Sequence, residues 1–139
     1  MFVTRPNDKG EAETQKIHIN YLHVGDIVHL KYGMLIPVDG IVLSCNQLMT
    51  NEAAMTGESD ERRKERVEVC QERLRERGQI DYSRIDKTES HSLPSSLLLS
   101  GTSVAGGDGK MLAIMVGKKS ALGEIMDKLT KRDGETPLQ

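Results

Sequence analysis

Short apolar runs separated by turn-forming residues fill the first third of the sequence, and they constrain the fold more than any other feature. Three such runs, at residues 27–30, 41–43 and 48–50, are separated by glycine-containing segments at 32–34 and 39–40. Runs this short are typical of strands rather than helices, and glycine, proline and aspartate between them are typical of turns. The sequence therefore predicts a compact antiparallel β unit.

Weaker patterns extend this β unit in both directions along the chain. Residues 17–19 alternate apolar and polar side chains, as a half-buried strand does, whereas residues 1–14 have no periodicity and are expected to form a turn or a loose end. Residues 103–105 and 110–116 have the composition of strands and flank a glycine-rich stretch at 106–109. We expect a hairpin there, with the glycines in its turn.

Two segments have the spacing of helices. Residues 60–77 are dense in charge and carry one narrow apolar stripe that ends before Gly78, formed by Val67, Cys70 and Leu74. Most of their charged pairs four residues apart have the same sign, so we expect a marginal helix on the outside of the domain. Near the C-terminal end, Ser120 is a candidate N-cap for a clearer amphipathic helix with apolar positions Leu122, Ile125, Met126 and Leu129.

Length and composition narrow the class of protein. A chain of 139 residues is expected to be one domain, spanning residues 1–139, with a core of Val, Ile, Leu and Met because it has one Phe and no Trp. The net charge is −2, and the run at 60–77 mixes seven basic with six acidic residues, so nucleic acid is not expected as a partner. No apolar run reaches the ~18 to 20 residues that cross a bilayer. Two separated cysteines, Cys45 and Cys70, favour a reduced cytosolic setting.

The candidate site is the run Thr56-Gly57-Glu58-Ser59. Glycine takes backbone angles that are closed to other residues and lets a phosphate or another backbone come close. The hydroxyls of Thr56 and Ser59 are able to hydrogen-bond to the local backbone, which would fix the direction of the Glu58 carboxylate. A carboxylate held in this way could orient a water molecule and accept its proton. Taken alone, these four residues favour an ordinary surface turn with a solvated glutamate.

Five blocks of the sequence resemble, in the same order, the actuator domain of P-type ATPases. The central block, residues 51–59, is similar to that family's Asp-Glu-Ser-x-Leu-Thr-Gly-Glu-Ser loop. The other four blocks are similar to the family's Val-Gly-Asp-Ile-Val, Ile-Pro-Ala-Asp-Gly, Leu-Ser-Gly-Thr-x-Val and Val-Gly-x-x-Ser-x-x-Gly, and they lie at residues 24–28, 36–40, 98–104 and 116–123. The departures lie outside the Thr-Gly-Glu core: Asn51 for Asp, Ala53-Ala54 for Ser-x and Val38 for Ala. Calcium pumps of the plasma-membrane kind are the most similar subgroup, and here the insertion at 60–92 is longer.

The resemblance implies a mainly β, α+β fold: a compact distorted β-barrel or jelly-roll-like domain with a C-terminal amphipathic helix and a charged insertion. It also implies the chemistry of an ATP-driven cation pump. In the family the pump is phosphorylated on an aspartate, and Glu58 would then direct water onto that phosphate. Gly57 would let the backbone approach the phosphoryl group, while Thr56 and Ser59 would shape the loop.

The resemblance further implies that the chain is one cytosolic piece of a larger protein at the cytoplasmic face of a membrane, expected to be the plasma membrane. Its partners would be the phosphorylation domain and the membrane helices of the same polypeptide. The domain itself is expected to bind no cofactor and no metal, with ATP and Mg²⁺ bound elsewhere in the pump, and to have no ATPase activity alone. The closing residues 135–139 resemble the segment before the third membrane helix of calcium pumps.

Alternatives remain at this stage. The transported ion could be Mg²⁺, Na⁺, K⁺ or H⁺ rather than Ca²⁺, or the chain could be a non-catalytic β-rich module that binds a partner. The insertion at 60–92 is either a solvated segment or a regulatory docking surface. Residues 101–110 lack the spacing of a phosphate-binding loop, and Asp86-Lys87-Thr88 matches only part of the family's phosphorylation motif. The four histidines have no partner residues spaced to complete a metal site: His18, His23, His29 and His91.

Overall fold

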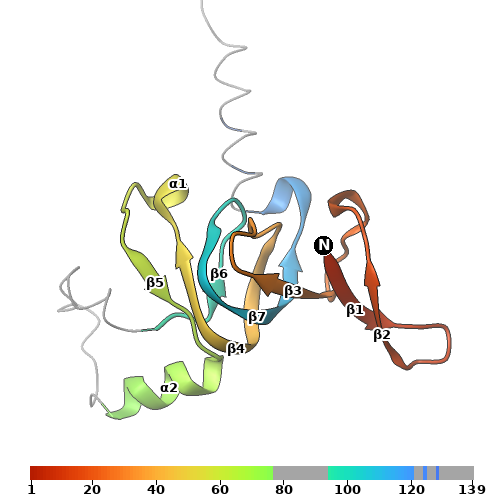
Figure 1. Cartoon of the computed structure of the whole chain (residues 1–139), viewed down its shortest axis with the longest axis horizontal. Coiled ribbons are helices and arrows are strands. Elements are labelled where there is room, and N and C mark those ends of the chain that lie inside the picture. The colour runs from red at the N-terminus through yellow and green to blue at the C-terminus, as the bar shows by residue number, and fades with distance from the viewer. Residues whose placement is uncertain (77–93, 121–123, 125–127, 129–139) are drawn as a thin grey trace, which may run out of the picture.

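The computed structural model describes residues 1–76, 94–120, 124 and 128. These residues form a seven-stranded antiparallel sheet in the order β2-β1-β3-β7-β4-β5, with β6 paired to β4 (Figure 1). The strands are β1 (Phe2–Pro6), β2 (Ala12–Lys16), β3 (Ile27–Lys31), β4 (Asp39–Asn51), β5 (Glu61–Arg63), β6 (Leu97–Leu98) and β7 (Ser103–Met115). The predicted mainly β class is confirmed, and within the described residues the sheet is an open one whose end strands β2 and β5 do not pair.

The first 16 residues are ordered into a hairpin, and the prediction for them was wrong. The strand expected at 17–19 lies earlier: β2 ends at Lys16, and a 3₁₀ turn η1 (Ile19–Tyr21) follows it. The expected loose end at 1–14 contains β1, which pairs with β2 and also with β3. Only Val3 of β1 is fully buried. The apolar alternation is weak here because this hairpin has little contact with the core.

The two longest strands, β4 and β7, are paired along almost their whole length. Two predicted turns were wrong. Residues 39–40 do not turn the chain but begin β4, and residues 106–109 are not a hairpin turn but the middle of β7. The glycines are needed there because β7 passes unusually close to β4. A Cβ at Gly107, which has φ +69°, would collide with the carbonyl oxygens of Asn46 and Gln47. Irregular pairing of β4 around residues 46–49 accompanies this close approach.

The core is aliphatic, as expected from the lack of large aromatic residues. Its buried side chains come from β1, β3, β4, β6, β7 and the connecting segments: Val3, Leu22, Val28, Leu30, Ile36, Val38, Val42, Leu48, Leu98, Val104, Met111 and Ala113. Between β6 and β7, the backbone N–H of Ser100 donates a hydrogen bond to the buried carboxylate of Asp39 (2.8 Å). This bond fixes the start of β4 against the loop that precedes β7.

The charged segment that follows the candidate loop contains a shorter helix than predicted. Residues 61–63 form β5, and the helix α2 spans Val67–Glu76. In Figure 1, the helices α1 (Ala53–Thr56) and α2 lie at opposite ends of the β4–β5 hairpin. The predicted end at Gly78 and the second part of the insertion, residues 77–92, lie outside the described residues. So does the apolar stripe of the C-terminal helix, although the Ser120 carbonyl accepts the N–H of Glu124 (2.9 Å), as an N-cap carbonyl does.

Candidate functional site

The loop that carries Glu58 is the tip of the β4–β5 hairpin. Strand β4 ends at Asn51, which pairs with Glu61 at the start of β5, and the nine residues between them include α1 and the loop. Thr56, Gly57, Glu58 and Ser59 are all exposed, and all four predicted site residues lie at this one tip. A tip of this kind presents a carboxylate to a surface that docks on it.

Local hydrogen bonds shape the loop, and Thr56 makes two of them. Its hydroxyl Oγ1 donates to the carbonyl of Glu52 (3.0 Å) and accepts from the backbone N–H of Glu58 (3.3 Å). Gly57 ends α1 in the left-handed conformation at φ +75°, and its N–H donates to the carbonyl of Ala53 (2.9 Å). The backbone of Glu58 is therefore held on its N-terminal side by the predicted threonine and glycine. The turn-holding role expected of Ser59 stays a prediction.

The replacement of the family's aspartate by Asn51 keeps a capping acceptor. The Oδ1 of Asn51 accepts the backbone N–H of Ala53 (2.9 Å) at the start of α1. An aspartate would offer an equivalent oxygen at this position. The substitution thus removes a charge from the helix start without removing the hydrogen bond.

A buried ion pair lies beneath the loop, and the sequence analysis missed it. Alternate residues of the chain at the end of β4, Leu48, Thr50 and Glu52, face the interior. The Glu52 carboxylate meets the ammonium group of Lys64, which follows β5, with 2.5 Å between Nζ and Oε1. Both side chains are almost fully buried, at 5% and 2% exposure. The alternation was the available signal, since it places a carboxylate on an otherwise apolar face, where it needs hydrogen-bond donors or a cation.

Further groups complete the surroundings of this ion pair. The Lys64 ammonium also donates to the carbonyl of Leu97 in β6 (2.7 Å), and the Thr50 hydroxyl donates to the Glu52 carboxylate (3.4 Å). Burial lowers the pKa of Lys64 from its ordinary value, and the hydrogen bond and charge of Glu52 offset part of that effect. The loop is thus tied through one lysine to β6, which pairs with the first half of β4 at Gly40 and Ile41.

Next to the ion pair, the thiol of Cys45 is held in a neutral state. It donates to the carboxylate of Glu65 (3.3 Å), which also accepts from Arg63 (2.8 Å). Burial, together with the hydrogen bond to Glu65, raises the pKa of Cys45 to about 11. Burial acts to raise the pKa of Glu65 as well, but the hydrogen bonds from Arg63 and Cys45 outweigh it, so that pKa is lowered. A thiol with this pKa is a poor nucleophile at neutral pH.

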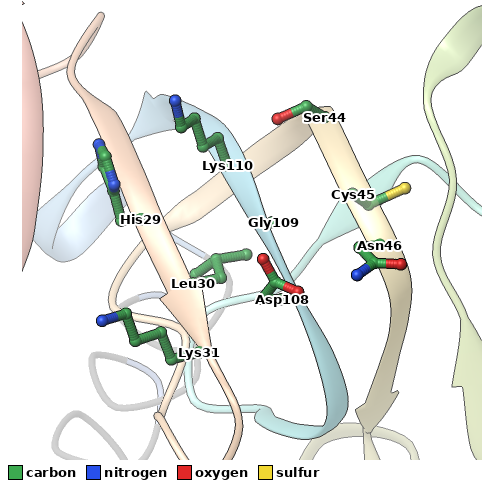
Figure 2. Close-up of a pocket in the computed structure, with 9 residues that line it drawn as sticks. All are labelled: His29, Leu30, Lys31, Ser44, Cys45, Asn46, Asp108, Gly109 and Lys110. Atoms are coloured by element: carbon green, nitrogen blue, oxygen red, sulfur yellow. The ribbon is translucent and has the colours of Figure 1, made fainter.

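A second group of charged residues lines a cleft of about 280 Å³ away from the loop (Figure 2). We call it the polar cleft, and it is lined by His29, Leu30, Lys31, Ser44, Cys45, Asn46, Asp108, Gly109 and Lys110. His29 and Lys110 are cross-strand partners in β3 and β7. Burial, then the charges of Lys110 and Lys31, lower the pKa of His29. Within the described part of the chain, Lys31, Lys110 and Asp108 take part in no ion pair.

Metal ligands and membrane-spanning helices are features that the expected domain would lack. Among the residues that the structure describes, no group of three or more His, Cys, Asp or Glu side chains is placed to hold a metal ion. Over that part of the chain, no helix has the length and apolar character needed to span a membrane. The partial motif Asp86-Lys87-Thr88 and His91 lie outside the described residues.

Comparisons with known proteins by family model and by sequence agree with each other. The model of the P-type ATPase actuator domain family matches residues 3–130. Calcium-transporting ATPase 4, plasma membrane-type, of Arabidopsis thaliana is 33% identical over 130 residues, which are 93% of this chain and 10% of that protein. Calcium-transporting ATPase 2 of Schizosaccharomyces pombe is 32% identical over 118 residues, or 85% of this chain and 8% of that protein. The chain therefore spans about a tenth of the length of these relatives.

Solved structures agree on the fold. The crystal structure of a zinc-transporting PIB-type ATPase in the E2.Pi state superposes with a TM-score of 0.62 at 19% identity, covering 99% of this chain and 18% of the other. A crystal structure of the same type of ATPase in a second state gives a TM-score of 0.61 at 18% identity, with the same coverage. At this level of identity, the likeness concerns the fold alone.

Proposed function

The chain belongs to the P-type ATPase actuator domain family and is related to plasma-membrane-type calcium-transporting ATPases, and from this premise we propose that it is the actuator domain of an ATP-driven calcium pump. In this proposal, Glu58 directs a water molecule onto an aspartyl phosphate carried by another domain of the same polypeptide. The rest of that polypeptide binds ATP and Mg²⁺ and spans a membrane, with this domain on the cytoplasmic side. The plasma membrane is the proposed location because of the names of the relatives.

One observation carries the proposal: Glu58 sits exposed at a hairpin tip whose backbone is held from below by Thr56. A general base must reach a phosphate that arrives from outside the domain, which requires exposure. It must also keep its direction when it arrives, which requires a fixed backbone. The exposure of Glu58 and the hydrogen bonds of Thr56 support the proposal on both points.

The proposed step is a hydrolysis. The oxygen of water forms a bond to phosphorus while the bond between phosphorus and the aspartate carboxylate oxygen breaks. Glu58 accepts the proton that the water loses, and the products are inorganic phosphate and a free aspartate carboxylate. Gly57 carries no side chain that would block the approaching phosphoryl group, and a Cβ built there meets no atom within 4 Å inside the domain.

The test is the decay of the phosphoenzyme in the complete pump that contains this domain. Glu58→Gln should leave phosphorylation by ATP intact and slow the decay by about 10²- to 10⁴-fold, the usual contribution of a general base. Glu61→Gln is the matched control, because Glu61 is an exposed glutamate three residues away in β5, and it should leave the decay unchanged. Equal decay rates in the native and Glu58→Gln pumps would show that the loop is only a turn and would favour a partner-binding module.

The choice of calcium is tested separately. Nothing in this domain contacts the transported ion in the proposal, so the ion is assigned from the relatives. Ion-stimulated phosphorylation of the complete pump should require Ca²⁺. Stimulation by Mg²⁺, Na⁺, K⁺ or H⁺ instead would keep the actuator assignment and replace the ion.

A further inference from the structure

Lys64 is a buried charge for which the proposed function gives no role. Its side chain is 2% exposed, and its ammonium group is held by the Glu52 carboxylate and by the carbonyl of Leu97. Burying an ion pair is costly, and apolar residues of similar volume often stabilise a protein as well or better. What an ion pair supplies and an apolar contact does not is a fixed direction for the groups that it joins.

A short series of contacts leads from Lys64 to the backbone of Glu58. Lys64 fixes the side chain of Glu52. The carbonyl of the same Glu52 accepts hydrogen bonds from the N–H groups of Met55 and Thr56 (2.9 Å each) and from the Thr56 hydroxyl (3.0 Å). That hydroxyl in turn accepts the N–H of Glu58 (3.3 Å). Glu52 is therefore the residue through which these contacts connect the interior of the domain to the loop.

Packing offers the loop little alternative support. Helix α1 has four residues, and none of them is buried. A helix this short has no independent stability in water, because its nucleation cost is not recovered by its few hydrogen bonds. The position of α1, and of the loop after it, therefore depends on the anchoring of Glu52.

We propose that Lys64 is a positioning residue for Glu58, acting through the Glu52 side chain and the Thr56 hydroxyl to hold the carboxylate in the orientation that hydrolysis requires. The inference rests on the proposed function and adds to it a residue outside the Thr-Gly-Glu loop. Lys64 touches neither phosphate nor water in this account. Its effect is confined to the dephosphorylation step, and the phosphorylation of the pump by ATP does not depend on it.

The experiment separates positioning from stability with three variants of the complete pump. Lys64→Met keeps the length of the side chain and removes its charge, and the double variant Glu52→Met with Lys64→Met replaces the ion pair by an apolar contact. Lys110→Met is the matched control, since it removes an exposed lysine in β7. For each variant the rates of phosphoenzyme formation and decay are measured, together with the thermal unfolding midpoint of the 139-residue chain.

Positioning predicts that the two readouts diverge in the double variant. Lys64→Met should lower the unfolding midpoint and slow the decay, since it leaves Glu52 buried without its cation. The double variant should recover most of the unfolding midpoint, yet its decay should stay about 10- to 100-fold slow, the range expected from a misplacement of about 1 Å. Lys110→Met should change neither readout. If the double variant recovered native decay together with native stability, the ion pair would be structural only and the inference would be overturned.

Glu58→Gln, measured in the same assay, distinguishes failure of the inference from failure of the proposed function. If Glu58→Gln slows the decay and the double variant does not, the proposed function stands and the role of Lys64 is wrong. If Glu58→Gln leaves the decay unchanged, the proposed function fails and the inference fails with it.

Discussion

The Glu58 loop, residues 51–59, and the polar cleft are two charged regions that share strand β4, but they are held in different ways. Beneath the loop, a buried ion pair and a series of hydrogen bonds reach the backbone of Glu58. In the polar cleft, Lys31, Asp108 and Lys110 are exposed and form no ion pair in the described part of the chain. The cleft gathers charged side chains, whereas the loop holds the backbone that carries one of them.

This difference separates a chemical site from a charged surface. A cluster of solvated side chains contributes little energy and no direction, because water screens each charge and each side chain rotates. An exposed carboxylate whose backbone is tied to the interior keeps its place of attachment without losing access to a partner. The number of charges in a region is therefore a poorer guide to function than the way in which one of them is anchored.

The strongest test of this difference in anchoring removes one carboxylate from each region. Glu52→Leu leaves Lys64 buried without its partner, and we expect the free energy of unfolding to fall by about 3–5 kcal/mol. Asp108→Leu removes an exposed carboxylate, and we expect a change within about 0.5 kcal/mol. Denaturant unfolding of the 139-residue chain measures both values. Similar losses for the two variants would mean that the ion pair is no better anchored than the cleft.

A second comparison uses two glycines of similar conformation. Gly57 in the loop has φ +75° with open space where a methyl group would be added, whereas Gly107 beside the cleft has φ +69° and faces the backbone of β4. Gly57→Ala should cost only the left-handed penalty, about 1–2 kcal/mol. Gly107→Ala adds the collision with Asn46 and Gln47 and should cost about 2–5 kcal/mol. Thermal unfolding of the two variants tests this order, which a smaller loss at Gly107 would reverse.

The hydrogen bonds of Thr56 give a smaller effect. Thr56→Val keeps the shape of the side chain and removes both of its bonds, so the Glu58 amide should exchange its hydrogen faster, by the equivalent of about 1 kcal/mol. Thr56→Ser should restore the slow exchange. In β1, Thr4→Val removes the hydrogen bond between the Thr4 hydroxyl and Nε2 of His29, a residue of the cleft, and should leave the Glu58 amide unaffected. Unchanged exchange in Thr56→Val would show that Thr56 does not hold the loop.

The smallest effect concerns the cleft alone and follows from His29. Its pKa is lowered by burial and by Lys110 and Lys31, so the unfolded chain takes up a proton at a higher pH than the folded one. Stability should therefore fall as the pH drops below the ordinary value of about 6.5 and level off below the folded pKa. His29→Gln should remove roughly a few tenths of a kcal/mol of this loss, since Asp108 faces the same cleft and water screens the charges. Unfolding midpoints between about pH 5 and 7.5 provide the measurement, and identical slopes for both proteins would contradict it.

The sequence predicted the fold class because its apolar runs are short and bounded by turn residues, and the structure places those runs in β3 and β4. Predictions from the sequence were wrong where the chain departs from a simple alternation of apolar and polar residues. The glycines at 106–109 suggested a turn, but they serve the close approach of β7 to β4, which no local pattern reveals. The N-terminal hairpin buries only Val3 of its first strand completely, so its apolar signal is faint.

The candidate site was predicted in part for similar reasons. Thr56 and Gly57 hold the turn through contacts within a few residues, and such contacts follow from local sequence. The pairing of Glu52 with Lys64 spans 12 positions and depends on the register of β5 against β4. A short charged strand gives no sign of that register in advance. The predicted helix was likewise extended too far toward residue 60, because charge density alone does not distinguish β5 from a helix.

The length of β4 has a mechanical consequence. Its 13 residues span about 40 Å at most, from the Asp39 carboxylate that holds Ser100 to the foot of the Glu58 loop. Apart from four register shifts, β7 is paired along almost all of it, so the two strands support each other over this length. A tilt of about 10° imposed at its start would carry the far end through about 7 Å, given the usual rise of a strand. The carboxylate at the tip could then be brought to a phosphate, or withdrawn from it, by a force applied at the opposite end of the domain.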